Sequence, residues 1–177
     1  IKSSAASDVY KRQKLNKSLL LLSRIENGQY TEMEDVSVDE ILDELLPDLM
    51  DIYEHKQVRL IRKREEQPFI IRCNHSLAQI LVSNLVKNSL LHNREGGELQ
   101  VLTTPTSLVI KNTGDVPLDG EKLFRRFYHG MDGKKDSTGL GLAIARSIAL
   151  SSSLKLTYEW QDGMHTFRLV KESEIYR

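Results

Sequence analysis

Two asparagines, Asn84 and Asn88, are the first residues whose type and spacing point to chemistry. They lie in residues 77–93, whose apolar positions recur with the period of an α-helix. On a helical wheel at ~100° per residue, both fall inside the apolar stripe, so we expect their amides to face inward. A buried amide without hydrogen-bond partners costs roughly 1–3 kcal/mol. The pair therefore indicates a bound ligand or metal ion or, as the alternative, two amides that satisfy nearby backbone groups.

Two glycines in a polar segment provide a second chemical signal. Gly139 and Gly141 directly precede apolar residues at helical spacing, so a helix should begin there. The first turn of a helix carries unpaired N–H groups and a positive dipole end, and both favour a bound phosphate. The segment matches neither a Walker loop nor a dinucleotide fingerprint, because Lys134 is followed by a second lysine and Ile144 occupies the place of the third glycine.

The order of these segments resembles the catalytic domain of the sensor histidine kinases. That domain carries an asparagine box, a first glycine box, a phenylalanine box and a second glycine box in this order. The corresponding segments here are residues 84–92, 112–114, 123–128 and 137–144. The resemblance covers about residues 14–170 and implies an ATP-binding catalytic domain over residues 31–177. Residues 14–30 resemble the end of the second helix of the family's dimerisation and phosphoacceptor hairpin, whereas residues 1–13 lack clear periodicity and are interpreted as linker or foreign sequence.

The resemblance implies that ATP and Mg²⁺ bind beside the asparagine helix. Asn88 matches the family's metal ligand, and an amide oxygen suits Mg²⁺, which keeps several waters beside few protein ligands. Asn84, one turn earlier, would support the nucleotide or a water, or else be a satisfied core amide. His92 would lie near the phosphates, or else be a structural histidine on an apolar face.

The other two boxes imply phosphate contacts and a lid. The resemblance assigns the following residues of the second glycine box to the phosphates: Thr138, Gly139, Leu140 and Gly141. Residues 113–136 form a long polar segment, and loops of this length are often functional. Three of its aromatic residues are expected to form a lid that packs on the nucleotide or on the hairpin: Phe124, Phe127 and Tyr128. The alternative is that the two phenylalanines form a stripe of the core.

The sequence departs from the family pattern at three positions. Asn112 stands where the family has an aspartate that accepts a hydrogen bond from the adenine amino group, which an amide oxygen can also accept. Gly114 would keep the backbone close to the base, but Val116 replaces the second glycine of that box. Lys87 replaces an acid found in many relatives, which disfavours an ATPase that activates water. Thr166 matches a family threonine near adenine, or is an ordinary strand residue.

The expected activity is that of a protein-histidine kinase fragment. In the family, the γ-phosphate of ATP passes to a histidine on the hairpin and then to an aspartate in the receiver domain of a response regulator. The acceptor lies on a hairpin helix beside an acidic residue, a setting absent from all five histidines of this sequence: His55, His75, His92, His129 and His165. We therefore expect an upstream acceptor and a homodimeric full-length protein. The alternative is a degenerate nucleotide-binding or protein-interaction module without kinase activity.

Composition narrows the remaining functional classes. The 177 residues include 25 basic and 25 acidic residues, so the zero net charge gives no support for nucleic-acid binding. The single Cys73 excludes an internal disulfide and fits a reducing compartment. No apolar run approaches the roughly 18 residues that cross a bilayer. We expect a cytoplasmic protein or the intracellular part of a membrane-anchored bacterial sensor. Because the sequence starts at Ile1 and not at Met, it reads as a piece of a longer chain.

Periodicity and turn residues predict the elements that position these groups. Helices are expected at residues 38–55, at 77–93 and after the second glycine box. Pro47 inside the first of them is unfavourable for a helix and can kink it. Strands are expected at residues 34–37, 58–62, 69–73, 98–104, 108–111, 154–160 and 164–170. This order predicts an α+β fold, a two-layer sandwich with a mixed, mainly antiparallel sheet and helices on one face, preceded by part of a hairpin helix.

Overall fold

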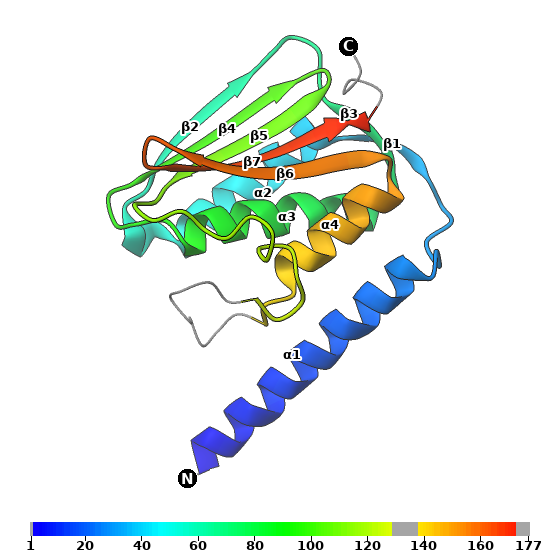
Figure 1. Ribbon diagram of the computed structural model, residues 1–177, viewed down its shortest axis with the longest axis vertical. Helices are drawn as coiled ribbons and strands as arrows, with labels where there is room; N and C mark the ends of the chain where they lie inside the picture. The colour runs from blue at the N-terminus through cyan, green and yellow to red at the C-terminus, as the bar shows by residue number, and fades with distance from the viewer. Residues whose placement is uncertain (1, 129–137, 173–177) are drawn as a thin grey trace.

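The computed structural model describes residues 2–128 and 138–172, in which helices cover one face of a sheet (Figure 1). The described helices are α1 (Lys2–Glu26), α2 (Val38–Ile52), the short 3-10 helix η1 (Glu54–Lys56), α3 (His75–Leu91) and α4 (Gly141–Ser151). The strands are β1 (Glu34–Ser37), β2 (Arg59–Arg64), β3 (Ile70–Cys73), β4 (Glu98–Thr104), β5 (Ser107–Thr113), β6 (Leu154–Gln161) and β7 (Met164–Lys171). Every element predicted from residue 34 onward is present, with bounds that shift by a few residues.

The main sheet has the strand order β2-β4-β5-β7-β6. β2 runs parallel to β4, and each other neighbouring pair is antiparallel. The parallel pair requires a crossover, which α3 supplies. β1 and β3 form a separate two-stranded antiparallel sheet. The predicted α+β class with a mixed, mainly antiparallel sheet is confirmed.

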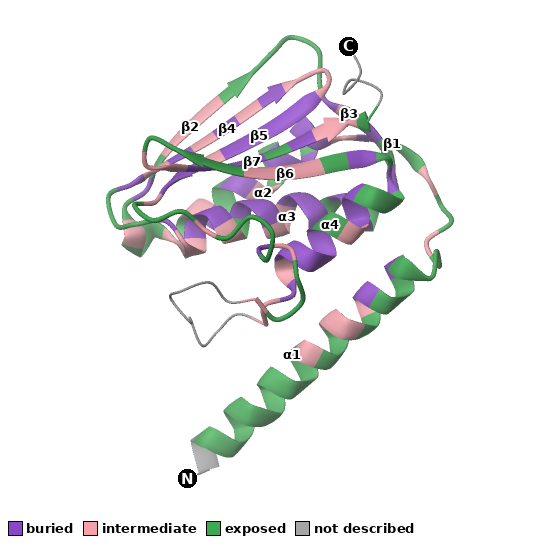
Figure 2. Cartoon of the chain, in the orientation of Figure 1, coloured by how far each residue is buried: buried purple, intermediate pink, exposed green. Residues whose placement is uncertain are grey.

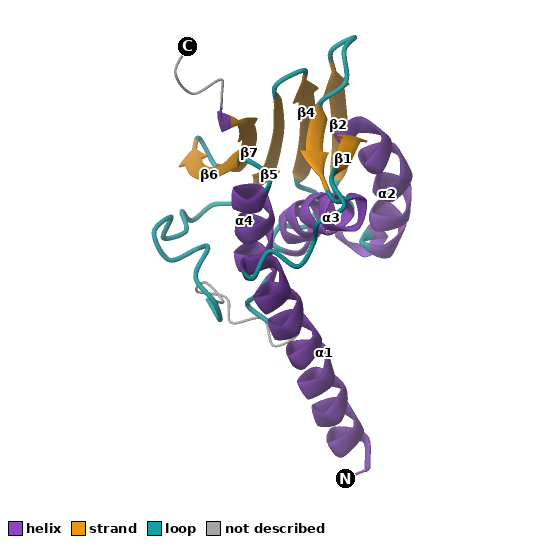
Figure 3. Cartoon of the chain, turned by 90° about the vertical axis from the view of Figure 1, so that its right-hand side faces the viewer, coloured by secondary structure: helices purple, strands orange, loops and turns teal. Residues whose placement is uncertain are grey.

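The core lies between the main sheet and helices α2, α3 and α4, which cover the same face of it (Figures 2 and 3). Side chains alternate along β4, where Leu99, Val101 and Thr103 are buried and their neighbours are partly exposed. Phe69 and Phe167 are among the largest side chains that are fully buried. This packing fixes α3 and α4 relative to the ends of β5 and β7.

Side chains define both ends of α3, the helix that carries the two asparagines. Asn74 caps its start, because its side-chain oxygen accepts a hydrogen bond from the Leu77 N–H at 3.2 Å. At the other end, Lys56 Nζ donates to the carbonyls of Leu90 and Asn93, each at 2.9 Å. A cation is favourable there because the carbonyl end of a helix is negative.

α1 begins at Lys2 and therefore includes residues 2–13, for which the sequence pattern indicated linker or foreign sequence. Residues 4–14 of α1 are exposed, and a helix without a buried face need not show apolar periodicity. Near its end Leu22 and Ile25 are buried, and α1 packs against α4 while the rest extends away from the sandwich (Figure 3). Within the described residues no helix, α1 included, is both long and apolar enough to cross a membrane.

A buried polar network joins α2 to β2 and β4. Asp39 is 5% exposed and accepts hydrogen bonds from the Phe69 backbone N–H at 2.8 Å and from the Thr103 hydroxyl. Its carboxylate also pairs with the Arg62 guanidinium. Burial alone would raise the pKa of the Asp39 carboxyl, but the hydrogen bonds and the charge of Arg62 outweigh burial and lower this pKa below its ordinary value of 3.8.

Candidate functional site

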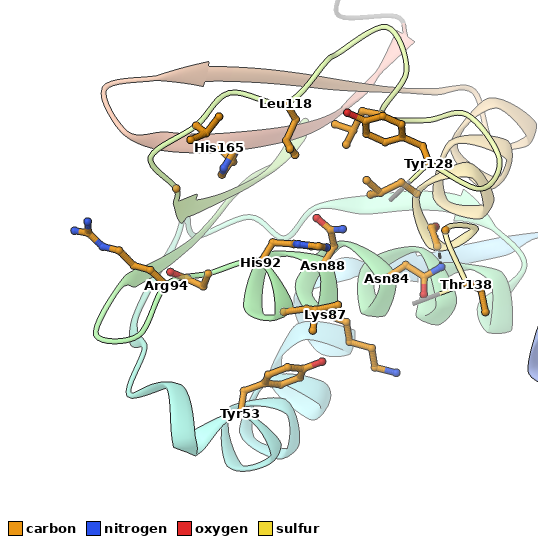
Figure 4. Close-up of a pocket in the computed structure, with 18 of the residues that line it drawn as sticks. Tyr53, Asn84, Lys87, Asn88, His92, Arg94, Leu118, Tyr128, Thr138 and His165 are labelled. Atoms are coloured by element: carbon orange, nitrogen blue, oxygen red, sulfur yellow. Dashed lines mark hydrogen bonds between the residues drawn. The ribbon is translucent and has the colours of Figure 1, made fainter. Parts of the chain in front are cut away.

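A cavity of about 750 Å³ opens beside α3, between the segment that follows β5 and the start of α4 (Figure 4). Small-molecule sites typically enclose ~300–1,000 Å³. Eight of the predicted site residues line it: Asn84, Asn88, His92, Gly114, Tyr128, Thr138, Gly139 and Gly141. Five others are absent from its lining: Asn112, Phe124, Phe127, Leu140 and Thr166. The cavity therefore brings together residues from all four boxes that the sequence showed.

Asn84 and Asn88 border the buried face of α3 and do not lie inside it, which corrects the helical-wheel expectation. The buried stripe runs through Leu81 and Leu85, and both asparagines are only half-buried. Asn84 donates from Nδ2 to the Gly141 carbonyl at 3.0 Å, so it joins α3 to α4. The Asn88 amide points into the cavity and makes no hydrogen bond to any described residue (Figure 4). Asn84 thus has a backbone partner, and Asn88 remains available to a ligand.

Two basic side chains extend this wall of the cavity. His92 directly follows α3, and its backbone N–H donates to the Asn88 carbonyl at 3.0 Å. Its imidazole lies beside Asn88 along the cavity (Figure 4). Lys87 also lines the cavity, although it is an exposed residue. Both placements suit a negatively charged ligand.

The second glycine box places the start of α4 at the cavity. Gly139 has a φ of +67°, a conformation that favours glycine, and its carbonyl accepts the Phe127 N–H at 2.9 Å. The Leu140 side chain is buried in the core, so only its backbone is placed to meet a ligand. Thr138 accepts a hydrogen bond from the Leu140 N–H at 3.4 Å. The N–H groups of the first turn of α4 have no partners within the helix, as at any helix start.

We expect Gly141→Ala to weaken binding of a triphosphate more than binding of adenosine. A β-carbon at Gly141 would meet nothing closer than Asn84 Cγ at 4.0 Å, so the protein itself has room for the methyl group. A ligand phosphate against the helix N–H groups would not have that room. Calorimetry with ATP and with adenosine measures the difference. Equal losses for both ligands would indicate a packing defect, and Gly120→Ala, which lies outside the cavity lining, is the matched control.

The opposite wall consists of β7 and residues 114–118. Three hydrogen bonds hold this segment to the β6–β7 hairpin: Gly114 N–H to the Gly163 carbonyl at 2.9 Å, Trp160 Nε1–H to the Gly114 carbonyl at 2.8 Å, and Leu118 N–H to the Tyr158 hydroxyl at 2.9 Å. His165 of β7 lies across the cavity from His92 and Asn88 (Figure 4). The wall that faces the asparagine helix is therefore fixed by the hairpin.

Thr166, expected near adenine, does not line the cavity. Side chains alternate along a strand, and Phe167 is in the core between sheet and helices, so His165 shares that face and Thr166 does not. His165 is the residue of β7 that lines the cavity. The sequence pattern did not indicate this role for His165.

Asn112 is 1% exposed and is not among the residues that line the cavity. Its Nδ2 donates to the Thr113 carbonyl at 3.3 Å. His165 is the cross-strand partner of Asn112. Of these two residues, His165 lines the cavity and Asn112 does not. The contact between Asn112 and adenine stays a prediction.

The phenylalanine box is divided between the core and the surface. Phe124 is half-buried and packs against the core, as the alternative interpretation expected. Phe127 is 51% exposed with a φ of +61°, and Tyr128 is the one aromatic residue of this box that lines the cavity. The rest of the predicted lid, residues 129–136, and Ser137 of the second glycine box lie outside the described residues.

α1 contributes to the cavity in a way that the sequence did not indicate. Lys14 and Ser18 line its mouth. Near the end of α1, Glu26 accepts two hydrogen bonds from one nitrogen of the Arg126 guanidinium, each at 2.7 Å. Both partners are about half exposed, so this ion pair adds little to stability. It nevertheless connects the phenylalanine box to the preceding helix.

Comparison with known proteins gives a consistent set of matches. A family described as histidine kinase-, DNA gyrase B- and HSP90-like ATPase matches residues 74–173. The sensor histidine kinase TrcS of Mycobacterium tuberculosis is 28% identical over 164 residues, which cover 85% of this chain and 32% of TrcS. The chain thus spans about a third of the length of this curated relative.

Solved structures show the same fold at low sequence identity. The Acinetobacter baumannii histidine kinase AdeS has a TM-score of 0.76 and 19% identity, with 97% of this chain and 84% of that chain covered. The histidine kinase ThkA in complex with the response regulator TrrA has a TM-score of 0.65 and 17% identity, with 89% and 48% covered. The fold is therefore also shared by described residues that precede the matched family region.

Proposed function

Because the chain belongs to the family of histidine kinase-, DNA gyrase B- and HSP90-like ATPases, we propose that its cavity binds Mg²⁺-ATP for phosphoryl transfer to a protein histidine. The domain would be the catalytic part of a two-component sensor histidine kinase. The observation that carries the proposal is the free Asn88 amide, which faces the same cavity as the start of α4. One wall offers an oxygen to a cation and another offers backbone N–H groups to phosphates.

The donors present suit a cation that is shared with the nucleotide. Among the described residues there is no group of three His, Cys, Asp or Glu side chains that could hold a metal by itself. Mg²⁺ commonly binds through one or two protein oxygens together with substrate phosphates and waters. Asn88 would hold the ion, which supplies charge neutralisation for the phosphates when bound.

The remaining residues would position the nucleotide. Asn84 holds the start of α4 through the Gly141 carbonyl, so the phosphate contacts keep a fixed distance from Asn88. His92 and Lys87 would add positive charge near the phosphates. Phosphoryl transfer depends mainly on positioning and on charge stabilisation, and transfer to an imidazole needs no activated water. A lysine in place of an acid at position 87 is therefore compatible with a kinase.

The partners follow from the same proposal. The γ-phosphate acceptor would be a histidine on the dimerisation hairpin of the same protein, and a response regulator would receive the phosphate from it. The ThkA–TrrA complex supports such a regulator as partner, and α1 supports the hairpin because it borders the cavity. The full-length protein would be a homodimer with this domain in the cytoplasm.

We expect this chain alone to form no phosphohistidine but to phosphorylate a supplied hairpin that carries the acceptor. In the sequence, none of its five histidines has the setting expected of the acceptor, and in the structure His92 and His165 line the cavity. Incubation with labelled ATP and Mg²⁺, followed by a test for acid-labile phosphate, distinguishes the two situations. A hairpin whose acceptor histidine is replaced by glutamine is the control. Acid-labile phosphate on the isolated chain would refute this prediction.

A further inference from the structure

A chain of hydrogen bonds fixes the orientation of His165. The Leu118 N–H donates to the Tyr158 hydroxyl at 2.9 Å, and this hydroxyl lies 2.8 Å from His165 Nδ1. Among the described residues Tyr158 has no other acceptor for its own proton, which favours donation from its hydroxyl to Nδ1. The imidazole then carries its proton on Nε2. Burial lowers the pKa of His165 and so favours this neutral form.

The Nε2 side of the ring lies against the backbone of Gly114. A β-carbon at Gly114 would be only 2.0 Å from His165 Nε2 and 2.2 Å from Cδ2, so a larger residue there would displace the ring. On the Nδ1 side, the imidazole and the Tyr158 ring are stacked, with 5.9 Å between centroids. These contacts allow one ring position, in which the residue borders the cavity.

The Nε2–H group has no hydrogen-bond partner among the described residues. His165 is the cross-strand neighbour of the buried Asn112, and it is the imidazole that borders the cavity. Because His165 borders the cavity, an acceptor atom of a bound ligand can take this hydrogen bond. The wall thus presents a donor of fixed direction to whatever fills this end of the cavity.

We propose that His165 recognises the base of the nucleotide by donating a hydrogen bond from Nε2–H to a purine ring nitrogen, with Tyr158 as the positioning residue that fixes the tautomer. This inference rests on the proposed function and deepens it by naming the group that contacts the base. In adenine, N1 and N7 are both acceptors at the edge of the ring. Replacement of either nitrogen by CH removes the acceptor and keeps the shape.

The test compares ADP, 1-deaza-ADP and 7-deaza-ADP on the wild-type chain and on His165→Phe. For the wild type, one of the two analogues should bind about three- to tenfold more weakly than ADP, the range expected for one hydrogen bond. In His165→Phe, the affinity for ADP should fall by a similar factor. The difference in affinity between ADP and that analogue should then vanish. Tripolyphosphate, which has no base, should bind both proteins equally.

The possible outcomes separate this inference from the proposed function. Equal affinity of the wild type for ADP and both analogues, or a penalty that persists in His165→Phe, would overturn the role of His165. Failure of the wild type to bind ADP at all would remove the proposed function instead.

Imidazole ¹⁵N NMR gives a second readout that does not need the His165 variant to fold. The wild type should show His165 as the Nε2–H tautomer. Tyr158→Phe should shift the His165 imidazole toward a mixture of tautomers, because the imidazole loses the donor that orients it. The affinity for ADP should fall about two- to fivefold. A wild-type ring that carries its proton on Nδ1 would contradict the inference.

Discussion

Asn88→Ala is expected to weaken Mg²⁺-dependent ADP binding by at least ~1.4 kcal/mol, a tenfold change in affinity. The Asn88 amide is the hard oxygen ligand that points into the cavity from α3, and no described residue occupies it with a hydrogen bond. Removal of the amide leaves the helix intact, because alanine is the best helix former. The loss should therefore appear in the metal-dependent part of the affinity.

Calorimetry with and without EDTA separates the metal-dependent part of the affinity for ADP from the metal-independent part. Gln79→Ala, an exposed residue of the same helix outside the cavity, should bind Mg²⁺-ADP like the wild type. In EDTA, Asn88→Ala should bind ADP nearly as well as the wild type does. Equal Mg²⁺-dependent affinity in the wild type and in Asn88→Ala would show that this residue holds no metal.

Asp39→Ala should lower the free energy of unfolding by about 3–5 kcal/mol, the usual cost of removing one partner from a buried ion pair. The substitution leaves the Arg62 guanidinium without its carboxylate and the Phe69 N–H without an acceptor. Urea unfolding at neutral pH measures the loss. The control is Asp43→Ala, whose ion pair with Arg64 is more than half exposed and should contribute at most about 1 kcal/mol.

The same carboxylate predicts a dependence of stability on pH. The pKa of Asp39 is lowered in the folded chain, so its contribution is fully present above the unfolded value near 3.8 and is lost as the pH falls through the lower folded value. The difference in stability between the wild type and Asp39→Ala should therefore shrink in acid. A difference that is constant from neutral pH down through this range would contradict the assigned network.

The box motifs and the order of elements were predictable because they depend on local patterns. The wheel for α3 placed the stripe too close to Asn84 and Asn88 because it relied on residues such as Ile80 and Leu91, which are only partly buried. It left out three residues that are buried: Val82, Val86 and Leu90. The two amides therefore lie at the margin of the core. This margin is where a side chain can contact both the protein and a ligand.

Two other features were beyond sequence reasoning for physical reasons. Residues 4–14 of α1 have no buried face, so no stripe marks them, and the contribution of Lys14 to the cavity is a contact over a long sequence separation. Along β7, the sequence alone does not tell which of His165 and Thr166 faces the helices; the structure decides this, because Phe167 is in the core and His165 shares its face. The register follows from the β6–β7 turn, where Asp162 and Gly163 both have positive φ.

The central claim is that this cavity binds a Mg²⁺-nucleotide, and titration of the ¹⁵N-labelled chain with ADP tests it directly. With Mg²⁺ present, amide shifts are expected around Asn88, Gly114 and Gly141, which come from three separate elements and line one cavity. Removal of Mg²⁺ should weaken the binding, whereas amides of β1 and β3 should stay unchanged throughout. Absence of any shift, or shifts confined to residues away from this cavity, would contradict the account.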